Sequence, residues 1–422
     1  MLSGRAPRQE ALPGKNSRRT FLKYAAGLAV VESAHAPARR ANSNPRMSSI
    51  WAYVGTYSSP QGPEGSPGRG QGIYLFQFNP ATGSLLRRDV FFDDSNPAWL
   101  TFDPSRKYLY SANETQTYRG KSAGSVSAYA IDGSSGHLTK LNTVSSEGAG
   151  PCHASVHPSG KYILVANYAG GSVAVLPIRP NGEIGPATDV KAHEGTVGPA
   201  HAASAPAGSF AISGHDHPHA HMIQADPSGQ FVLASDLGLD RILIYRFDSQ
   251  EGKLSAHTPA FAPLPPGDGP RHFTFHPNGR WVYSLQEEGS TLAVFDYDPA
   301  LGRLNLKQAL SSLSKGFAGT NFTSEVVVSS DGKFVYAANR LHDSIAFFSI
   351  GDEGTLTFVG EEWTRGDYPR SFGIDPTGNF LYSCNQRSDA ITAFRINRKT
   401  GNLKFTGQYT PVGTPAIIVF LA

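Results

Sequence analysis

The chain has 422 residues, with 45 glycines and 30 prolines, and only 17% of its side chains are charged, a balance typical of many turns between short strands. No stretch is apolar over the roughly 18 residues that a membrane helix needs, so no membrane span is expected. The net charge of +3 is weak evidence for a nucleic-acid partner, because residues 1–36 alone contain six basic and two acidic side chains. We therefore expect no nucleic-acid partner.

The first 36 residues predict an export signal. Residues 17–23 (SRRTFLK) resemble the twin-arginine motif, 24–31 supply a short apolar run, and 34–36 (AHA) offer a small-x-small cleavage site. Glu32 is irregular for such a signal, and a basic tail on a cytoplasmic protein is the alternative. We expect a periplasmic protein with a signal peptide over 1–36, a disordered linker over 37–49 and one domain over 50–422.

A turn that opens onto a strand recurs six times after residue 100. The copies start roughly 45 to 70 residues apart, the interval of β-propeller blades. Proline usually presets the turn, and the glycine that usually follows tolerates positive φ, so each copy predicts a tight hairpin. The turns begin at Asp103, His157, Asp226, His276, Ser330 and Asp375.

One repeat predicts four antiparallel strands, at 324–329, 333–339, 343–350 and 355–361. The same order recurs over 97–145, 151–192, 219–265, 270–313 and 369–411. Three strands within 51–92 and a fourth at 415–421 complete a seventh unit. The sequence therefore predicts an all-β, seven-bladed β-propeller of four-stranded blades, closed by pairing of the N- and C-terminal strands and expected to be a monomer. A stack of sheets that does not close is the alternative.

Charged and imidazole side chains mark two places in each unit that can face a central channel: the start of the inner strand and the turn between the second and third strands. Buried charge is costly unless it is paired, so these groups predict a polar, anion-binding pocket on the axis. Bracing of adjacent blades is the alternative for Arg271 or Arg340. The candidates are His153, His219, His221, Arg271, Glu325 and Arg370 at strand starts, and Asp240, Arg241, Glu287, Arg340 and Gln386 in the turns.

The segment 193–218 is longer than a hairpin needs and contains four histidines, which favours a functional role. Within 215–221 (HDHPHAH), alternate residues of an extended strand would share a face and could hold zinc. Because Pro218 interrupts such a strand and no second ligand cluster is evident, we expect neither a metal nor a cofactor. Substrate binding or acid–base chemistry by His221 is favoured. Cys152 and Cys384 are expected to be buried free thiols.

These residues resemble the seven-bladed propeller lactonases, a family that includes bacterial 6-phosphogluconolactonases and fungal carboxy-cis,cis-muconate cyclases. The resemblance covers the chain after about residue 50. It rests on the motifs at 53–57 (YVGTY), 150–153 (GPCH), 217–221 (HPHAH), 236–241 (DLGLDR), 269–272 (GPRH), 324–325 (SE) and 369–370 (PR).

The resemblance implies a hydrolase that opens a sugar-acid or related anionic lactone, with a small-molecule lactone as its partner. In the cyclase branch the proposed site is a histidine, two arginines and a glutamate, which match His221, Arg271, Arg340 and Glu287. The arginines would hold the anionic group and stabilise the oxyanion, Glu287 would activate a water, and His221 would protonate the ring oxygen. The other candidates above would bind substrate.

Two other functions stay open at this point. An isomerase that opens or closes a muconolactone would use the same four residues. A propeller without catalysis could bind a ligand or protein on one face. Because 6-phosphogluconolactone is made inside cells, an exported protein would seldom meet it, and the natural substrate also stays open.

Overall fold

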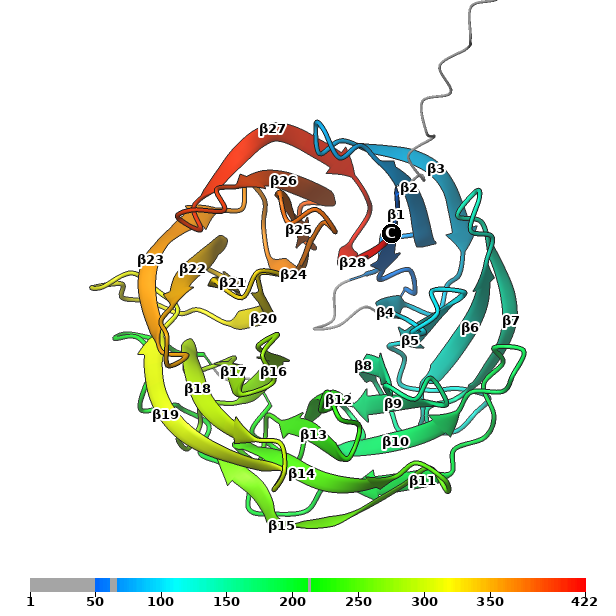
Figure 1. The fold of residues 1–422 in the computed structure, drawn as a ribbon, viewed down its shortest axis with the longest axis horizontal. Coiled ribbons are helices and arrows are strands. Elements are labelled where there is room, and N and C mark those ends of the chain that lie inside the picture. Colours follow the sequence, from blue (N-terminus) through cyan, green and yellow to red (C-terminus); the bar gives the residue numbers. More distant parts are fainter. Residues whose placement is uncertain (1–49, 61–66, 212–213) are drawn as a thin grey trace, which may run out of the picture. The chain divides into compact units, whose positions relative to one another are not determined.

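The computed structural model describes residues 50–60, 67–211 and 214–422, so the predicted leader and linker lie outside the described residues. In this part of the chain, 28 strands form seven four-stranded antiparallel sheets, arranged as blades around an axis (Figure 1). Among these residues no helix is long and apolar enough to cross a bilayer. The predicted seven-bladed propeller is confirmed.

The blades are numbered here in chain order, and each is given from its inner to its outer strand. Blade 1 contains β28 (Pro415–Leu421), β1 (Ile50–Thr56), β2 (Gly72–Phe78) and β3 (Leu85–Phe92). Blade 2 contains β4 (Pro97–Phe102), β5 (Tyr108–Asn113), β6 (Ser125–Ile131) and β7 (Leu138–Ser145). Blade 3 contains β8 (Pro151–Val156), β9 (Tyr162–Asn167), β10 (Ser172–Pro177) and β11 (Asp189–Ala192).

The other four blades follow the same order. Blade 4 contains β12 (Ala220–Ala225), β13 (Phe231–Asp236), β14 (Arg241–Asp248) and β15 (Lys253–Pro263). Blade 5 contains β16 (Pro270–Phe275), β17 (Trp281–Gln286), β18 (Thr291–Asp298) and β19 (Arg303–Ser311). Blade 6 contains β20 (Thr323–Val328), β21 (Phe334–Asn339), β22 (Ser344–Ile350) and β23 (Leu356–Trp363). Blade 7 contains β24 (Pro369–Ile374), β25 (Phe380–Asn385), β26 (Ala390–Ile396) and β27 (Leu403–Pro411).

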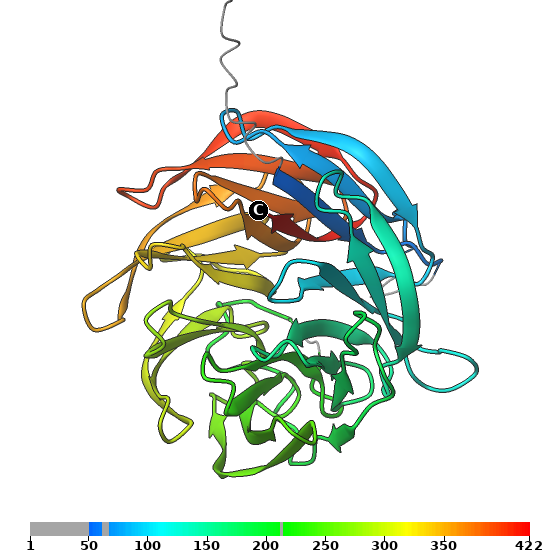
Figure 2. The same cartoon turned by 45° about the vertical axis from the view of Figure 1, so that its right-hand side comes forward.

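The two ends of the propeller domain meet in blade 1. The C-terminal strand β28 pairs antiparallel with β1 and takes the innermost position, so the red and blue ends of the ribbon lie side by side (Figures 1 and 2). This pairing confirms the predicted closure. It also joins the last blade to the first without leaving an open sheet edge at the junction.

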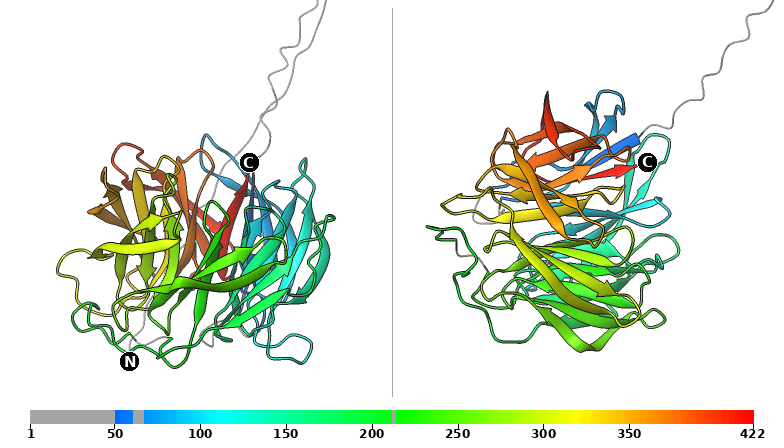
Figure 3. Two further views of the ribbon diagram at one scale, coloured as in Figure 1. Left: turned by 60° about the horizontal axis from the view of Figure 1, so that its bottom comes forward. Right: turned by 60° about the vertical axis from the view of Figure 1, so that its left-hand side comes forward.

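Each sheet is buried on both faces, because alternate side chains of a strand contact the blade before and the blade after. In β21, for example, Tyr336 and Ala338 pack toward blade 7, while Val335 and Ala337 pack toward blade 5. Seven apolar clusters of this kind fill the seven boundaries between neighbouring blades. Figure 3 shows the blades stacked around the ring in side view. The core is therefore a ring of interfaces, and it leaves the axis to other side chains.

A repeated hydrogen bond fixes the spacing of the blades. A buried tyrosine of the second strand donates its hydroxyl to a glycine carbonyl in the outer turn of the next blade, as Tyr336 does to Gly401 at 2.9 Å. These glycines have positive φ, which a residue without Cβ adopts at low cost. The same bond joins Tyr53 to Gly136, Tyr110 to Gly182, Tyr283 to Gly354 and Tyr382 to Gly83.

A β-bulge follows the first residue of every inner strand. In β16, Pro270 pairs with Gln286 and His272 pairs with Leu285, which leaves Arg271 between them without a partner across the ladder. A bulge of this kind bends the strand and redirects a side chain. The residues in this position are Ala98, Cys152, His221, Arg271, the pair Ser324 and Glu325, Arg370 and Ala416.

The long connection between β11 and β12, residues 193–219, is held against blades 4 and 5 by a buried histidine. The two ring nitrogens of His215 lie 3.1 Å from Asp240 Oδ1 and 2.8 Å from Glu288 Oε2. Burial by itself would lower the pKa of His215, but Asp240 and Glu288 outweigh it and raise the pKa to about 9. His215 is therefore an imidazolium ion that ties this connection to two blades.

This ion pair predicts a loss of stability in mild alkali. Because the pKa of His215 rises from an ordinary 6.5 to about 9 on folding, its contribution is complete below pH 6.5 and is lost as the pH rises through 9. We expect the free energy of unfolding, measured with urea, to fall by roughly 3 kcal/mol over this range. The His215→Gln variant should be less stable at pH 6.5 and show a flatter profile. Parallel profiles for the two proteins would contradict the assignment.

Candidate active site

A cavity of about 400 Å³ opens where the bulges and the turns between the second and third strands meet. Two carboxylates and three guanidinium groups line it, together with one imidazole and aromatic rings. This excess of positive charge suits an anionic ligand or an anion that develops during a reaction. The polar lining consists of Glu114, Gln116, Tyr168, His221, Glu287, Arg340, Tyr368, Arg370 and Arg387.

The lining comes mainly from two repeated positions in the blades. His221 and Arg370 occupy bulges of inner strands. Glu114, Tyr168, Glu287 and Arg340 each follow the last residue of a second strand, at the turn into the third strand. Because every blade has the same strand order, the bulge and the turn of each blade lie at the same end of the ring. Residues from both of these positions, far apart in sequence, thus line one cavity.

Glu287 is the centre of a buried charge network between blades 5 and 6. Its Oε2 atom lies 2.9 Å from Arg271 Nε and 2.6 Å from Arg340 Nη2. Arg340 also donates to the Tyr368 hydroxyl at 3.1 Å and to the Thr323 carbonyl at 3.2 Å. Burial alone would raise the pKa of Glu287, but the two arginines hold it below its usual value. Glu287 is thus an ionised carboxylate that fixes two guanidinium groups.

A second carboxylate lies across the pocket. Glu114 Oε2 accepts a hydrogen bond of 2.7 Å from the Tyr57 hydroxyl and lies 3.7 Å from Arg370 Nη2. The guanidinium carbon of Arg370 also lies 5.4 Å from the centre of the Tyr57 ring, within the range of a cation–π contact. This group presents Arg370 and Glu114 to the cavity with Tyr57 behind them.

His221 lies between the two charge networks and is a neutral imidazole. Burial, together with the positive charge of nearby Arg271, places the pKa of His221 well below the ordinary 6.5. Its Nδ1 atom lies 3.7 Å from the Cys152 sulfur, and its ring meets that of Tyr168 edge to face at 5.3 Å. A neutral ring has one nitrogen lone pair, so His221 can accept a proton at neutral pH.

Four of the residues expected from the sequence line this pocket, namely His221, Glu287, Arg340 and Arg370. Arg271 lies one layer behind, where it lines a smaller cavity of about 10 Å³ together with His221 and Arg370. Arg271 is thus absent from the lining of the 400 Å³ cavity, and its expected contact with substrate stays a prediction. Arg271 and Arg340 also brace blades 5 and 6 by pairing with Glu287, which was the alternative to substrate binding for these two arginines.

His153 and Glu325 lie deeper than the pocket, among buried rings. His153 packs on Trp99, with ring centres 4.5 Å apart, and Glu325 Oε1 lies 3.1 Å from Nδ1 of His272. Burial raises the pKa of Glu325 to about 8. Neither residue lines the 400 Å³ cavity. Their expected contact with substrate stays a prediction.

Four more candidates stand apart from the cavity lining. Asp240 accepts hydrogen bonds from the backbone of Gly267 and Gly269 and pairs with His215, so its carboxylate is used in the fold. Arg241 lies over the Phe261 ring at 4.4 Å. Gln386 is buried and is not among the lining residues. His219 stacks on Tyr168 at 4.2 Å, at the edge of the pocket.

The pocket also contains residues that were not among the predicted site residues, chiefly Glu114, Tyr168, Tyr368 and Arg387. Arg387 lies over the Tyr368 ring, with its guanidinium carbon 3.7 Å from the ring centre. A signal for two of them was present, because Glu114 and Tyr168 follow an asparagine at the same repeat position as Arg340. Cys152 and Cys384 are both buried free thiols, as expected.

Comparisons with known proteins agree with this architecture. Residues 51–420 match the family model described as lactonase, 7-bladed beta-propeller. A 6-phosphogluconolactonase of Bacillus subtilis is 32% identical over 377 residues, which are 89% of this chain and 99% of the relative. A periplasmic gluconolactonase of Pseudomonas aeruginosa superposes with a TM-score of 0.79 at 32% identity, covering 89% of this chain and 99% of that one. The chain therefore belongs to the seven-bladed β-propeller lactonase family.

Proposed function

We propose that this protein is a lactone hydrolase that opens a sugar-acid lactone to the open-chain acid in the 400 Å³ cavity. The observation that supports this most is the placement of a neutral imidazole, His221, in the same cavity as the guanidinium groups of Arg340 and Arg370. Hydrolysis of a lactone needs a base for water and a positive site for the oxyanion. The relatives named 6-phosphogluconolactonase and periplasmic gluconolactonase act on lactones by name.

In the proposed mechanism His221 accepts a proton from a water molecule as that water attacks the lactone carbonyl. Negative charge then develops on the carbonyl oxygen, and Arg340 and Arg370 stabilise it by charge-assisted hydrogen bonds. When the ring C–O bond breaks, the imidazolium of His221 returns the proton to the departing oxygen. One residue thus acts first as base and then as acid.

Glu287 takes a different role from the one that the resemblance implied. Because its Oε2 atom lies 2.9 Å from Arg271 Nε and 2.6 Å from Arg340 Nη2, its charge is already engaged by two guanidinium groups. We assign it the positioning of Arg340, with Arg271 as the second support. A guanidinium that is already oriented does not have to reorganise when the oxyanion forms.

The choice between hydrolysis and isomerisation rests on the names of the relatives, since one cavity could serve both reactions. The product carboxylate would be attracted to the arginines whichever lactone is the substrate. The positive lining also fits a substrate that is itself anionic, through a carboxylate or a phosphate.

The first prediction concerns turnover. The full chain should release acid from D-glucono-1,5-lactone or its 6-phosphate faster than the spontaneous reaction, as followed in a pH-stat. Loss of the base should lower kcat by about 10²- to 10⁴-fold in His221→Ala. The control is His137→Ala, which changes an exposed histidine in a turn of blade 2 and should leave kcat unchanged.

Product analysis by NMR completes this test. An open-chain acid supports the hydrolase, and an isomeric lactone would favour the isomerase. If no lactone in the panel reacts above the spontaneous rate, or if His221→Ala is as active as the unchanged protein, the proposal is wrong.

The second prediction concerns pH. The neutral form of His221 is the active one, so activity is lost as the pH falls through its pKa, which lies well below 6.5. After subtraction of the spontaneous reaction, kcat/KM should stay level between pH 6.5 and 8 and decline only in more acidic buffer. A midpoint of the acidic limb above pH 6.5 would exclude His221 as the base.

We also propose that residues 1–36 are a signal peptide. This signal would direct export of the propeller domain by the twin-arginine route. The support is Arg18 and Arg19 in their sequence context, together with the periplasmic relative. Replacing both arginines with lysine should keep the protein in the cytoplasm when cells are fractionated. The unchanged chain should appear in the periplasm, and equal distribution of the two proteins would contradict this proposal.

A further inference from the structure

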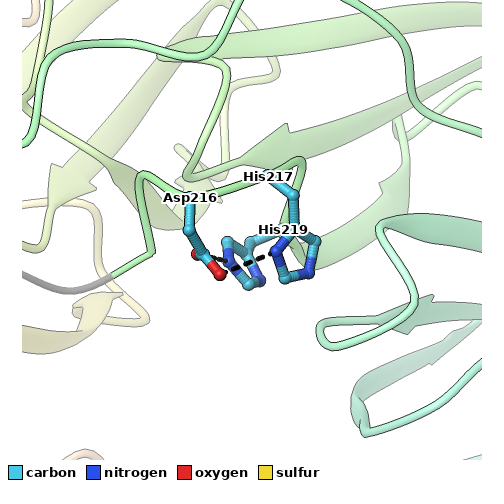
Figure 4. A group of neighbouring side chains, drawn as sticks. All are labelled: Asp216, His217 and His219. Carbon is cyan, nitrogen blue, oxygen red and sulfur yellow. Dashed lines mark hydrogen bonds and ion pairs between the residues drawn. The ribbon is translucent and has the colours of Figure 1, made fainter.

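Three polar side chains converge in the turn that precedes β12. Asp216, His217 and His219 place one ligand atom each within 4.8 Å of one another, and among the described residues this is the group of histidine, cysteine and acidic side chains that could hold a metal ion. Figure 4 shows the two imidazole rings facing the carboxylate of Asp216. The proposed mechanism uses none of these three residues.

The Asp216 carboxylate meets one nitrogen of each ring. Its Oδ2 lies 2.9 Å from His217 Nδ1, and its Oδ1 lies 2.7 Å from His219 Nε2. The other nitrogen of each ring faces a backbone carbonyl. His217 Nε2 lies 3.3 Å from the Ala169 oxygen, and His219 Nδ1 lies 3.0 Å from the Tyr168 oxygen.

These carbonyls fix which nitrogen bears the proton. A carbonyl oxygen can only accept a hydrogen bond, so the nitrogen that faces it must be an N–H. In its neutral form an imidazole has one N–H, so in that form the nitrogens that face Asp216 present lone pairs. Two nitrogen lone pairs and a carboxylate then face one another, an arrangement that is favourable only when a proton or a cation lies between them.

The surroundings resemble the support that metal-binding histidines receive. Such histidines donate their second ring N–H to a carbonyl or carboxylate, which fixes both tautomer and orientation. Here both rings have that bond, and stacking of His219 on Tyr168 at 4.2 Å holds the more buried ring in place. Asp216 is largely exposed, which leaves a side open to an ion from solvent.

We infer that Asp216, His217 and His219 form a binding site for a divalent transition metal ion of the zinc class, with the remaining coordination position open to solvent. Two imidazole nitrogens and one carboxylate oxygen form a ligand set that zinc accepts, and cobalt, nickel and copper ions bind similar sets. The site lies beside the pocket, because Tyr168 contacts His219 and also lines the 400 Å³ cavity.

The interruption by Pro218, which counted against a metal in the sequence, does not prevent this site. Pro218 was expected to prevent alternate histidines from sharing the face of a strand. Strand β12 begins only at Ala220, so His217 and His219 belong to the preceding turn. Their convergence on Asp216 depends on this turn and needs no strand. His215 is not a member, because Asp240 and Glu288 hold it.

The test measures metal binding directly and does not depend on the proposed lactonase activity. Tag-free full-length protein is treated with chelator, dialysed and titrated calorimetrically with ZnCl₂ at pH 7.5. We expect one strong site with a Kd of about micromolar or tighter. Titration with Co²⁺ should produce the visible absorption of a protein-bound ion in the same 1:1 ratio.

Variants locate the site. His217→Ala and Asp216→Ala should each weaken zinc binding at least about 10-fold. His201→Ala removes another exposed histidine from the same connection and should bind zinc as the unchanged protein does. Urea unfolding of each variant without metal checks that the fold is retained, which is expected because His217 and Asp216 are at least partly exposed.

Two outcomes would overturn the inference. One is the absence of any zinc binding up to about millimolar concentration, which would mean that a proton on the imidazoles balances Asp216. The other is binding of equal affinity in His217→Ala and the unchanged protein, which would place the ion elsewhere. Lower affinity at pH 5.5 than at pH 7.5 is expected in addition, because protons compete for the imidazole nitrogens.

Discussion

The bulge at the start of each inner strand is the constraint on which the site depends. It takes one residue, or two in blade 6, out of the ladder, and ring closure brings these residues to one end of the axis. In a regular strand, that side chain would alternate into the apolar boundary between blades. The bulge thus allows His221, Arg271 and Arg370 to occupy a polar centre while the faces of the sheets stay apolar.

The carboxylates at this centre hold the arginines in place before any substrate binds. Arginines taken out of water are stable only when their donors are satisfied, and Glu287 provides this for Arg271 and Arg340. Glu114 has the matching position opposite, near Arg370. Burial keeps His221 uncharged, and the same positive field that suits an anion acts in the same direction, which connects the binding of an oxyanion to the supply of a base.

The connection between β11 and β12 places three more histidines, His215, His217 and His219, near this centre. His215 is charged and pairs with Glu288, the neighbour in sequence of Glu287, so the anchoring of the connection and the charge network share one turn of blade 5. His217 and His219 instead face Asp216 at the edge of the pocket. Three histidines within five positions thus have different partners.

The sequence by itself determined the number of blades, their strand order and the closure by β28, because turn chemistry and short apolar runs are local signals. It also pointed to the two repeat positions that face the axis. Only the tertiary structure decided which polar residues meet there. Asp240 is used by His215 and two backbone amides, whereas Glu114 and Tyr168 reach the cavity. Glu287 and Arg340, like His272 and Glu325, belong to neighbouring blades and lie about 50 residues apart along the chain, and no local pattern specifies such a pairing.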